Sequence, residues 1–275
     1  MKRRSLSSLQ YARNDRILHE QNPVADMFHV KHRMDTLGLM ELQAGAWGLP
    51  LGHDRRGRLQ EYARYLALYD RANVIGTRDL DRILLDHVLD SLSCFLHEPL
   101  LRARRLADVG SGGGLPGIPI KIMRPELAIT LVESTGKKAR FLQHAVEGLS
   151  LEGVEVANTR VEELGRTREH RGAYDVVTCR AVAGLSVVAE YCVPLLETGG
   201  CALAMKGRLE PEELAEGDRA VAALGARVAA TMKVPTIPEV GEKERHLVIL
   251  EKIRETPARY PRRPGKVAKR PLGVQ

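Results

Sequence analysis

The chain has 275 residues, of which 44% are hydrophobic and 28% are charged, and its formal net charge is +7. These proportions are typical of globular proteins and exclude a chain that is disordered throughout, a collagen and a coiled-coil array. The length fits one large α/β domain with attached segments, or two small domains.

Sequence features of membrane, secreted and metal-binding proteins are missing from the chain. No stretch approaches the roughly 20 apolar residues that cross a bilayer. The basic opening MKRRSLSSLQ is not followed by the apolar run of a secretory signal. The four cysteines show no CxxC spacing, so we expect neither a bound metal nor a disulfide framework. We therefore expect a soluble protein of the cytoplasm without a membrane partner.

Basic residues are concentrated at the two ends. Residues 254–275 contain seven Lys or Arg against one Glu, and residues 1–33 contain seven against three acids. Basic ends on a slightly acidic body indicate a protein that grips a polyanion, although a solvated solubility tail has the same composition. Because four prolines block a continuous helix in the tail, we expect an extended basic strap with Tyr260 as its stacking ring.

The first 37 residues show no sustained periodicity and are expected to be a poorly ordered extension. Within them, residues 27–32 read MFHVKH. The codons ATG TTT CAC GTG AAA CAC would encode this peptide and contain the palindrome TGTTTCACGTGAAACA, which resembles a bacterial chromosome-partition centromere site. The hypothesis is that the hexapeptide reflects a constraint on the DNA, and the alternative is chance codon compatibility. Any other codon choice in the gene excludes the hypothesis.

Residues 38–100 are expected to form a helical cap. Helical spacing of apolar residues predicts one helix over 58–70 and a second over 79–96. His87 falls on the apolar stripe of the second helix, where a histidine is normally a satisfied inner-face residue and not a catalytic one.

Residues 101–253 alternate between short apolar runs and helical patterns. This alternation predicts an α/β fold, a parallel sheet with helices on both faces. The expected strands are 106–109, 128–132, 154–157, 174–178, 200–205, 226–234 and 246–253. The expected helices are 115–123, 137–149, 185–196 and 212–224.

A glycine loop follows the first strand of this domain. Gly110, Gly112 and Gly114 lie between a strand and a helix, where the chain must turn sharply and let a ligand approach its backbone. Glu133 ends the next strand, where a carboxylate can accept both hydroxyls of a ribose. Loop, strand and acid together predict a nucleoside cofactor.

The identity of that cofactor is less direct. Gly112-x-Gly114-x-x-Gly117 also satisfies the dinucleotide pattern of dehydrogenases. Two features favour S-adenosylmethionine instead. Asp108 ends the first strand, where an acid can orient the loop around an amino-acid moiety, and the pair Val161-Glu162 follows the third strand, where it could frame an adenine.

Several separate segments, in order, give the chain a family resemblance. They are LLDHVLDSL (84–92), DVGSGGGLPGIPIKI (108–122), TLVESTGKKARFL (130–142), TRVEEL (159–164), YDVVTCRAVAGL (174–185), LAMKG (203–207) and YPRRPGKVAKRPL (260–272). In these segments the chain resembles the bacterial 16S ribosomal RNA guanine-N7 methyltransferases, the glucose-inhibited division protein B family. Three positions of the cap depart from the family pattern, Leu68-Tyr69, Asn73-Val74-Ile75 and Asp86, and they concern RNA docking more than cofactor binding.

The resemblance implies a class I S-adenosylmethionine-dependent methyltransferase fold, a Rossmann-like, seven-stranded, mostly parallel sheet with an N-terminal helical cap. It implies cofactor contacts at Gly110, Leu115, Val161, Glu162 and Arg180, with Glu133 at the ribose. The implied substrate is 16S ribosomal RNA, alone or in the small subunit, and we expect a monomer.

The implied reaction is an in-line methyl transfer to guanine N7, whose free lone pair needs no general base. Arg180, at the carboxyl end of the fourth strand, is expected to orient cofactor or guanine as the catalytic residue. Cys179 beside it is expected to be a small core residue. The residues expected to contact RNA phosphates are Lys206, Arg262, Arg263, Lys266, Lys269 and Arg270. The alternatives are a methyltransferase of another RNA or of a small molecule, a non-catalytic assembly factor, and the dehydrogenase.

Overall fold

The computed structural model describes residues 35–241 and 243–274. The expectations about residues 1–34, including the hexapeptide Met27–His32, lie outside the described residues. Residues 35–37 belong to the ordered part, because helix α2 (Thr36–Ala46) begins there, with the Asp35 carboxylate accepting a hydrogen bond of 2.7 Å from the amide of Gly38.

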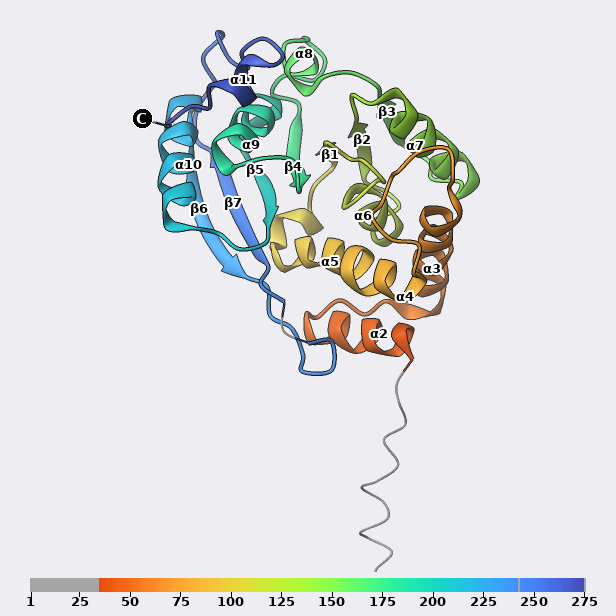
Figure 1. Cartoon of the computed structure of the whole chain (residues 1–275). Coiled ribbons are helices and arrows are strands. Elements are labelled where there is room, and N and C mark those ends of the chain that lie inside the picture. The colour runs from red at the N-terminus through yellow and green to blue at the C-terminus, as the bar shows by residue number, and fades with distance from the viewer. Residues whose placement is uncertain (1–34, 242, 275) are drawn as a thin grey trace, which may run out of the picture. The chain divides into compact units, whose positions relative to one another are not determined.

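The described strands form one seven-stranded sheet (Figure 1). Its order is β3-β2-β1-β4-β5-β7-β6. All neighbouring pairs are parallel except those made by β7, which runs antiparallel to β5 and β6. The strands are β1 (Arg105–Val109), β2 (Ala128–Val132), β3 (Val154–Ala157), β4 (Tyr174–Arg180), β5 (Leu196–Lys206), β6 (Ala226–Lys233) and β7 (His246–Lys252). The predicted α/β fold with a mostly parallel sheet is confirmed.

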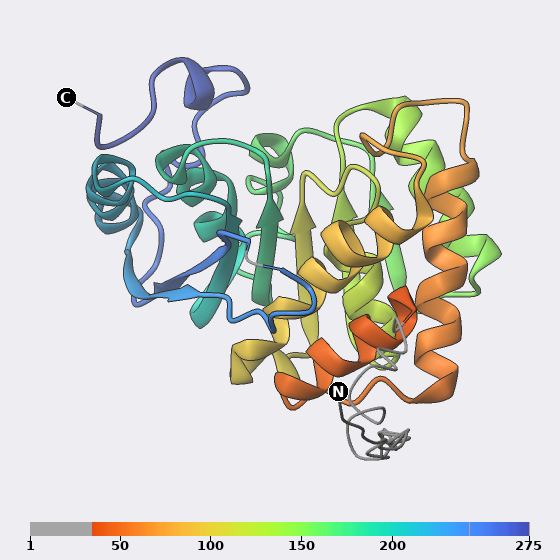
Figure 2. The same ribbon diagram turned by 60° about the horizontal axis from the view of Figure 1, so that its bottom comes forward.

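Helices cover both faces of this sheet. One face packs against the cap together with α6 (Gly117–Met123) and α7 (Gly136–Gly148), and the other against α9 (Leu185–Cys192) and α10 (Pro211–Leu224). The short helix α8 (Val161–Leu164) follows β3. Figures 1 and 2 show the cap helix α3 and the blue C-terminal tail on opposite sides of the sheet.

The two-residue period of the strands decides which side chains meet the cap. Leu106 of β1 and Val176 of β4 pack in the cap-side core, and their neighbours Ala107 and Val177 pack in the opposite core. Successive strand residues point to opposite faces. Arg180 lies four residues after Val176, so its side chain reaches the cap side of the sheet.

The second cap helix differs from its prediction. The structure replaces one α-helix over 79–96 by four consecutive segments: α4 (Leu80–Arg82), a π-helical turn (Ile83–Val88), α5 (Leu89–Leu92) and a 3-10 turn (Ser93–Leu96). A six-residue π turn shifts the apolar stripe too little to be visible in the residue pattern, and such turns are frequent at functional sites. Helix α3 spans Gly52–Leu68, so it begins six residues before its predicted start and ends two residues before its predicted end. A 3-10 turn (Glu98–Leu101) leads into β1.

The tail is not the extended strap that the prolines indicated. It packs on α9 and contains a short helix, α11 (Lys266–Lys269), with Val267 fully buried. Tyr260 is only 6% exposed and packs in the core on the α9 face, so it is not free to stack on a base. The guanidinium of Arg171 donates hydrogen bonds to the carbonyl oxygens of Thr256 (2.8 Å) and Tyr260 (2.7 Å). The prolines prevent a long helix in the tail, but they do not prevent the tail from packing against α9.

Among the described helices, none combines the length and the apolar character that a membrane crossing requires.

Candidate functional site

A hollow of about 240 Å³ opens at the carboxyl ends of β1 and β2 and at the beginning of α8. We call it the Glu133 hollow. Of the residues predicted to contact a cofactor, it brings together Gly110, Glu133, Val161 and Glu162. Ligands of open α/β sheets bind at this edge of the strands.

The carboxylate of Glu133 joins the glycine loop to the end of β2. Its Oε2 accepts a hydrogen bond of 3.0 Å from the amide of Gly112, and its Oε1 accepts one of 2.7 Å from the amide of Thr135. Each carboxylate oxygen has a second lone pair, so the group can still accept hydrogen bonds from a ligand such as a ribose. The residue is 7% exposed and lines the hollow.

Glu162 is the second acid of the same hollow. It is 2% exposed and lines the hollow, and its oxygens are not among the buried atoms that lack a partner in the described residues. A carboxylate oxygen accepts hydrogen bonds, so this acid can take a donor from a ligand. Val161 beside it gives the hollow an apolar wall.

Gly110 needs to be glycine both for its backbone and for its surroundings. Its φ is +70°, and a Cβ there would lie 2.6 Å from Cγ2 of Val182, which leans over the loop. Glycine therefore lets the loop pack closely against Val182 at the edge of the hollow. The residues of the hollow, an acid for a ribose, a second acid, an apolar wall and a glycine loop, fit S-adenosylmethionine.

Gly114 and Leu115, which were also predicted to contact a cofactor, do not line this hollow. Leu115 is 6% exposed and packs in the cap-side core, and the helix predicted from it begins at Gly117. The hydroxyl of Tyr62 in α3 donates a 2.5 Å hydrogen bond to the carbonyl of Gly113, so the cap helps to fix this half of the loop.

Asp108 lies beneath the loop and is completely buried. Its carboxylate accepts hydrogen bonds from the Thr178 hydroxyl (2.9 Å) and the Gly117 amide (3.2 Å), and burial raises the pKa of Asp108 to about 6. Asp108 thus holds the start of α6 against β4 and cannot itself contact a ligand.

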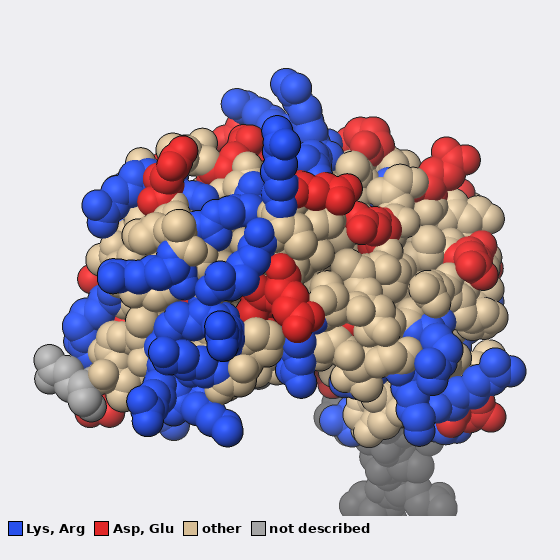
Figure 3. Space-filling model, turned by 90° about the horizontal axis from the view of Figure 1, so that it is seen from above, with Lys and Arg blue, Asp and Glu red and all other residues tan. Residues whose placement is uncertain are grey.

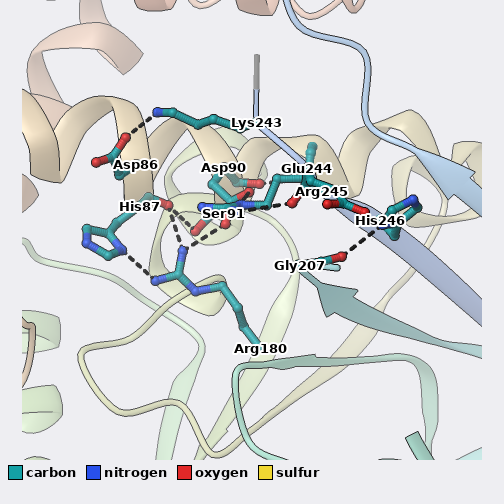
Figure 4. A network of polar contacts seen from close by, with 11 residues as sticks. Asp86, His87, Asp90, Ser91, Arg180, Gly207, Lys243, Glu244, Arg245 and His246 are labelled. Carbon is teal, nitrogen blue, oxygen red and sulfur yellow. Dashed lines mark hydrogen bonds and ion pairs between the residues drawn. The ribbon is translucent and has the colours of Figure 1, made fainter. Parts of the chain in front are cut away.

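Arg180 lines a different hollow, of about 560 Å³, which we call the Arg180 hollow. Figure 4 shows its guanidinium between His87 and Asp90 of the cap. Its Nη2 atom lies 2.9 Å from Nδ1 of His87, and Nη1 donates to Asp90 Oδ2 at 3.1 Å and to the His87 carbonyl at 3.3 Å. Burial raises the pKa of Asp90, against the opposing effect of Arg180. The cap holds the head group of Arg180 in this arrangement, and its contact with a cofactor stays a prediction.

The loop after β4 separates the two hollows. Ala181 lines the Arg180 hollow, whereas Val182 and Ala183 line the Glu133 hollow. Ala181 has a φ of +53°, a backbone conformation that residues other than glycine rarely adopt. Such conformations are common at functional sites.

Lys206 fastens this loop. Its ammonium donates to the carbonyl of Ala183 (3.0 Å) and pairs with Glu213 at 2.6 Å, and Glu213 also accepts from the amide of Leu185. The charge of Lys206 is thus already paired inside the protein, and its contact with a phosphate stays a prediction.

The basic residues of the tail divide into two kinds. Arg263, Lys266, Lys269 and Arg270 are exposed. Arg262 is instead bonded to the fully buried Glu190 and anchors the tail, and its contact with a phosphate stays a prediction. Figure 3 shows Lys and Arg side chains gathered on one side of the upper face of the molecule, where the tail lies in Figure 1.

Sequence reasoning missed the cap residues that complete the site. His87 was assigned to the core, and Asp90 and Tyr62 were not assigned to the site at all. Their signal is weak, because only the fold brings them to residues about 50 to 90 positions away. Cys179 is 2% exposed and packs in the core as expected. Within the described residues, no cluster of three His, Cys, Asp or Glu side chains could hold a metal ion.

Comparison with known proteins gives consistent matches. The family model GidB, described as rRNA small subunit methyltransferase G, matches residues 55–248. A protein of Rubrobacter xylanophilus named ribosomal RNA small subunit methyltransferase G is 57% identical over 246 residues, which cover 89% of this chain and 94% of that protein. A protein of the same name from Chloroflexus aggregans is 46% identical over 229 residues, 82% of this chain and 94% of its own.

Similarity to solved structures extends to more distant proteins. The apo structure of the S-adenosylmethionine-dependent methyltransferase SibL has a TM-score of 0.50 at 13% identity, covering 72% of this chain and 70% of that chain. At this identity the match concerns the fold alone, and it agrees with the sheet described above.

Proposed function

The chain belongs to the GidB family, the rRNA small subunit methyltransferase G proteins, and on this premise we propose that it methylates N7 of one guanine in 16S ribosomal RNA. S-adenosylmethionine supplies the methyl group when it is bound. Membership of the family supports methylation of small-subunit ribosomal RNA. The methylated atom, guanine N7, is our proposal.

The observation that carries the proposal is the set of hydrogen-bond acceptors and apolar groups that line the Glu133 hollow. We assign the ribose hydroxyls to Glu133 and the adenine edge to Glu162 and Val161, with the backbone of Gly110 beside the amino-acid chain. A dehydrogenase is disfavoured because the family model and the curated relatives are RNA methyltransferases.

The chain's own residues contribute alignment more than acid–base chemistry. Guanine N7 has a free lone pair, so no proton must be removed before attack. Holding two reactants in line can contribute roughly 7–11 kcal/mol to lowering the barrier. The loop Ala181–Ala183, fastened by Lys206, lies between the two hollows, and we propose that the methyl group and guanine N7 meet at its edge.

The reaction is tested by nucleoside mass spectrometry of 16S RNA. Small subunits from a strain that lacks the modification are incubated with the protein and labelled S-adenosylmethionine. We expect N7-methylguanosine at a single site, and about 10-fold or greater loss with Arg180→Ala, because several hydrogen bonds of the site are removed. Label in another base, or in no RNA despite cofactor binding, would favour another methyl acceptor or an assembly role.

We propose that the exposed tail residues bind phosphates. The variant with Lys266, Lys269 and Arg270 all changed to Gln is expected to bind 16S RNA more weakly. The slope of log affinity against log salt should decrease by about 0.7–0.9 for each phosphate that the variant no longer neutralises. Filter binding at several salt concentrations measures it, with Arg55→Gln, an exposed change at the start of α3, as the control. An unchanged slope would mean that these residues only solvate the tail.

Three further expectations belong to this proposal. We propose that the protein acts as a monomer in the cytoplasm, where small subunits are found, and that it needs no metal. Retained activity in a chelator and a monomeric mass in solution are the corresponding checks.

A further inference from the structure

The Arg180 hollow has the position and charge of a nucleotide site. Residues of the loop Ala181–Ala183 line both this hollow and the Glu133 hollow. Apart from Lys206, which pairs with Glu213, four Lys or Arg and two Asp line the Arg180 hollow, so its surroundings carry a net positive charge that favours an anion such as a phosphodiester. Its volume of about 560 Å³ falls in the range of roughly 300–1,000 Å³ that ligand sites occupy.

The contacts of His87 show which of its two ring nitrogens carries the proton. Its Nδ1 lies 2.9 Å from Nη2 of Arg180, and a guanidinium can only donate hydrogen bonds. Nδ1 must therefore accept, and the single proton of the neutral ring is on Nε2. Burial, together with the charge of Arg180, lowers the pKa of His87 to about 4, which keeps the ring neutral at physiological pH.

The Nε2–H group is left for a ligand. Within the described residues it has no hydrogen-bond partner, and it is not among the buried unsatisfied atoms. Figure 4 shows one ring nitrogen of His87 turned toward Arg180 and the other turned away from it. His87 lines the Arg180 hollow, so its imidazole brings a donor of fixed tautomer to the edge of that hollow.

We propose that the target guanine occupies the Arg180 hollow and that His87 Nε2–H donates a hydrogen bond to its O6 atom. This assignment rests on the proposed RNA methylation and names the group that recognises the base. His87 is then a guanine-recognition residue, whereas the sequence predicted an inner-face core histidine.

A donor at O6 explains two requirements of the reaction together. Guanine carries an acceptor at O6 where adenine carries the N6 amino donor, so one Nε2–H group separates the two purines. A contact confined to O6 also leaves the N7 lone pair free. Arg180 acts through His87 in this arrangement and is a positioning residue for the base, since its contacts with His87 and Asp90 already occupy Nη1 and one side of Nη2.

Two amide substitutions separate the two ring nitrogens. His87→Gln places an amide N–H near the position of Nε2 and keeps the donor. His87→Asn places an amide oxygen near the position of Nδ1, which keeps the acceptor for Arg180 and removes the donor. We expect kcat/KM on small subunits to fall about tenfold or more in His87→Asn and to stay within about threefold of wild type in His87→Gln. Equal binding of S-adenosylmethionine by both variants shows that each is folded.

A modified substrate distinguishes base recognition by His87 from a purely structural role, because a structural role would not change the preference between the two bases. The target guanine of 16S RNA is replaced by 2-aminopurine, which lacks the oxygen at position 6, and the RNA is assembled into small subunits. Wild type is expected to prefer guanine by about tenfold or more, and His87→Asn is expected to lose that preference. Preference retained in His87→Asn, or equal losses in both variants with the preference intact, would overturn the assignment. If wild type forms no N7-methylguanosine, the proposed function itself has failed, which is a different result.

Discussion

The Arg262→Ala variant is expected to unfold with a free energy lower than that of wild type by about 3–5 kcal/mol, the usual cost of leaving one member of a buried ion pair alone. The partner is Glu190 of α9, whose exposed fraction is 0%. Its carboxylate accepts hydrogen bonds from Arg262 Nη2 (2.6 Å), Nε (2.9 Å) and the backbone amide (2.7 Å). No other charged partner of Glu190 is found among the described residues.

Urea denaturation followed by circular dichroism measures this effect. The control is Arg263→Ala, one position on and exposed to solvent, for which a change within about 0.5 kcal/mol is expected. Limited proteolysis distinguishes global unfolding from release of the tail alone, since release exposes residues 254–275 to cleavage while the sheet stays intact. Equal stability of the two variants would mean that Glu190 is solvated without Arg262.

The second large effect is expected at Glu133. Changing Glu133 to Gln removes the charge and turns one accepting oxygen into a donor, which conflicts with the amides of Gly112 and Thr135 as well as with a ribose. Hydrogen bonds to charged groups contribute about 1.5–3 kcal/mol, so we expect the affinity for S-adenosylmethionine to fall about 10- to 100-fold.

Equilibrium dialysis with labelled S-adenosylmethionine measures the affinity directly. The matched control is Glu147→Gln, an exposed change near the end of α7 that lies outside the Glu133 hollow. Thermal unfolding of both variants without cofactor shows how much of the loss comes from the loop. If Glu133→Gln binds S-adenosylmethionine like wild type, the cofactor is held elsewhere.

The sheet could be predicted closely because its strands are short apolar runs between turn residues. The bounds of β2 and β3 agree with the sequence pattern at both ends, and those of β1 to within one residue. β5 was predicted too short, since it begins at Leu196 and passes through two glycines that read as a turn. Helix α2 was missed because its apolar residues are not confined to one face and its glycines lower its helical propensity.

The candidate site was predictable where one segment of chain carries the signal. Gly110 and Glu133 lie on consecutive strand ends, and the sequence places such ends at one edge of a parallel sheet. Partners that are distant in sequence carry no such signal. Arg262 and Lys206 look like free cations until the fold supplies Glu190 and Glu213, and nothing near His87 in the sequence indicates Arg180.

The packing of the cap has a consequence for how the chain is made. Trp47, just after α2, donates its indole N–H to the carbonyl of Pro235 at 2.8 Å, and the amide of Ile237 donates to Gln43 at 2.7 Å. These partners lie about 190 positions later, so they leave the ribosome long after α2 has emerged. Closing so long a loop comes late in folding, because the chain loses the entropy of closure before the interactions that compensate it can form. During synthesis α2 and α3 can therefore pack on the cap segments and α6 first, and the contacts of α2 with Pro235 and Ile237 form only after most of the chain has emerged.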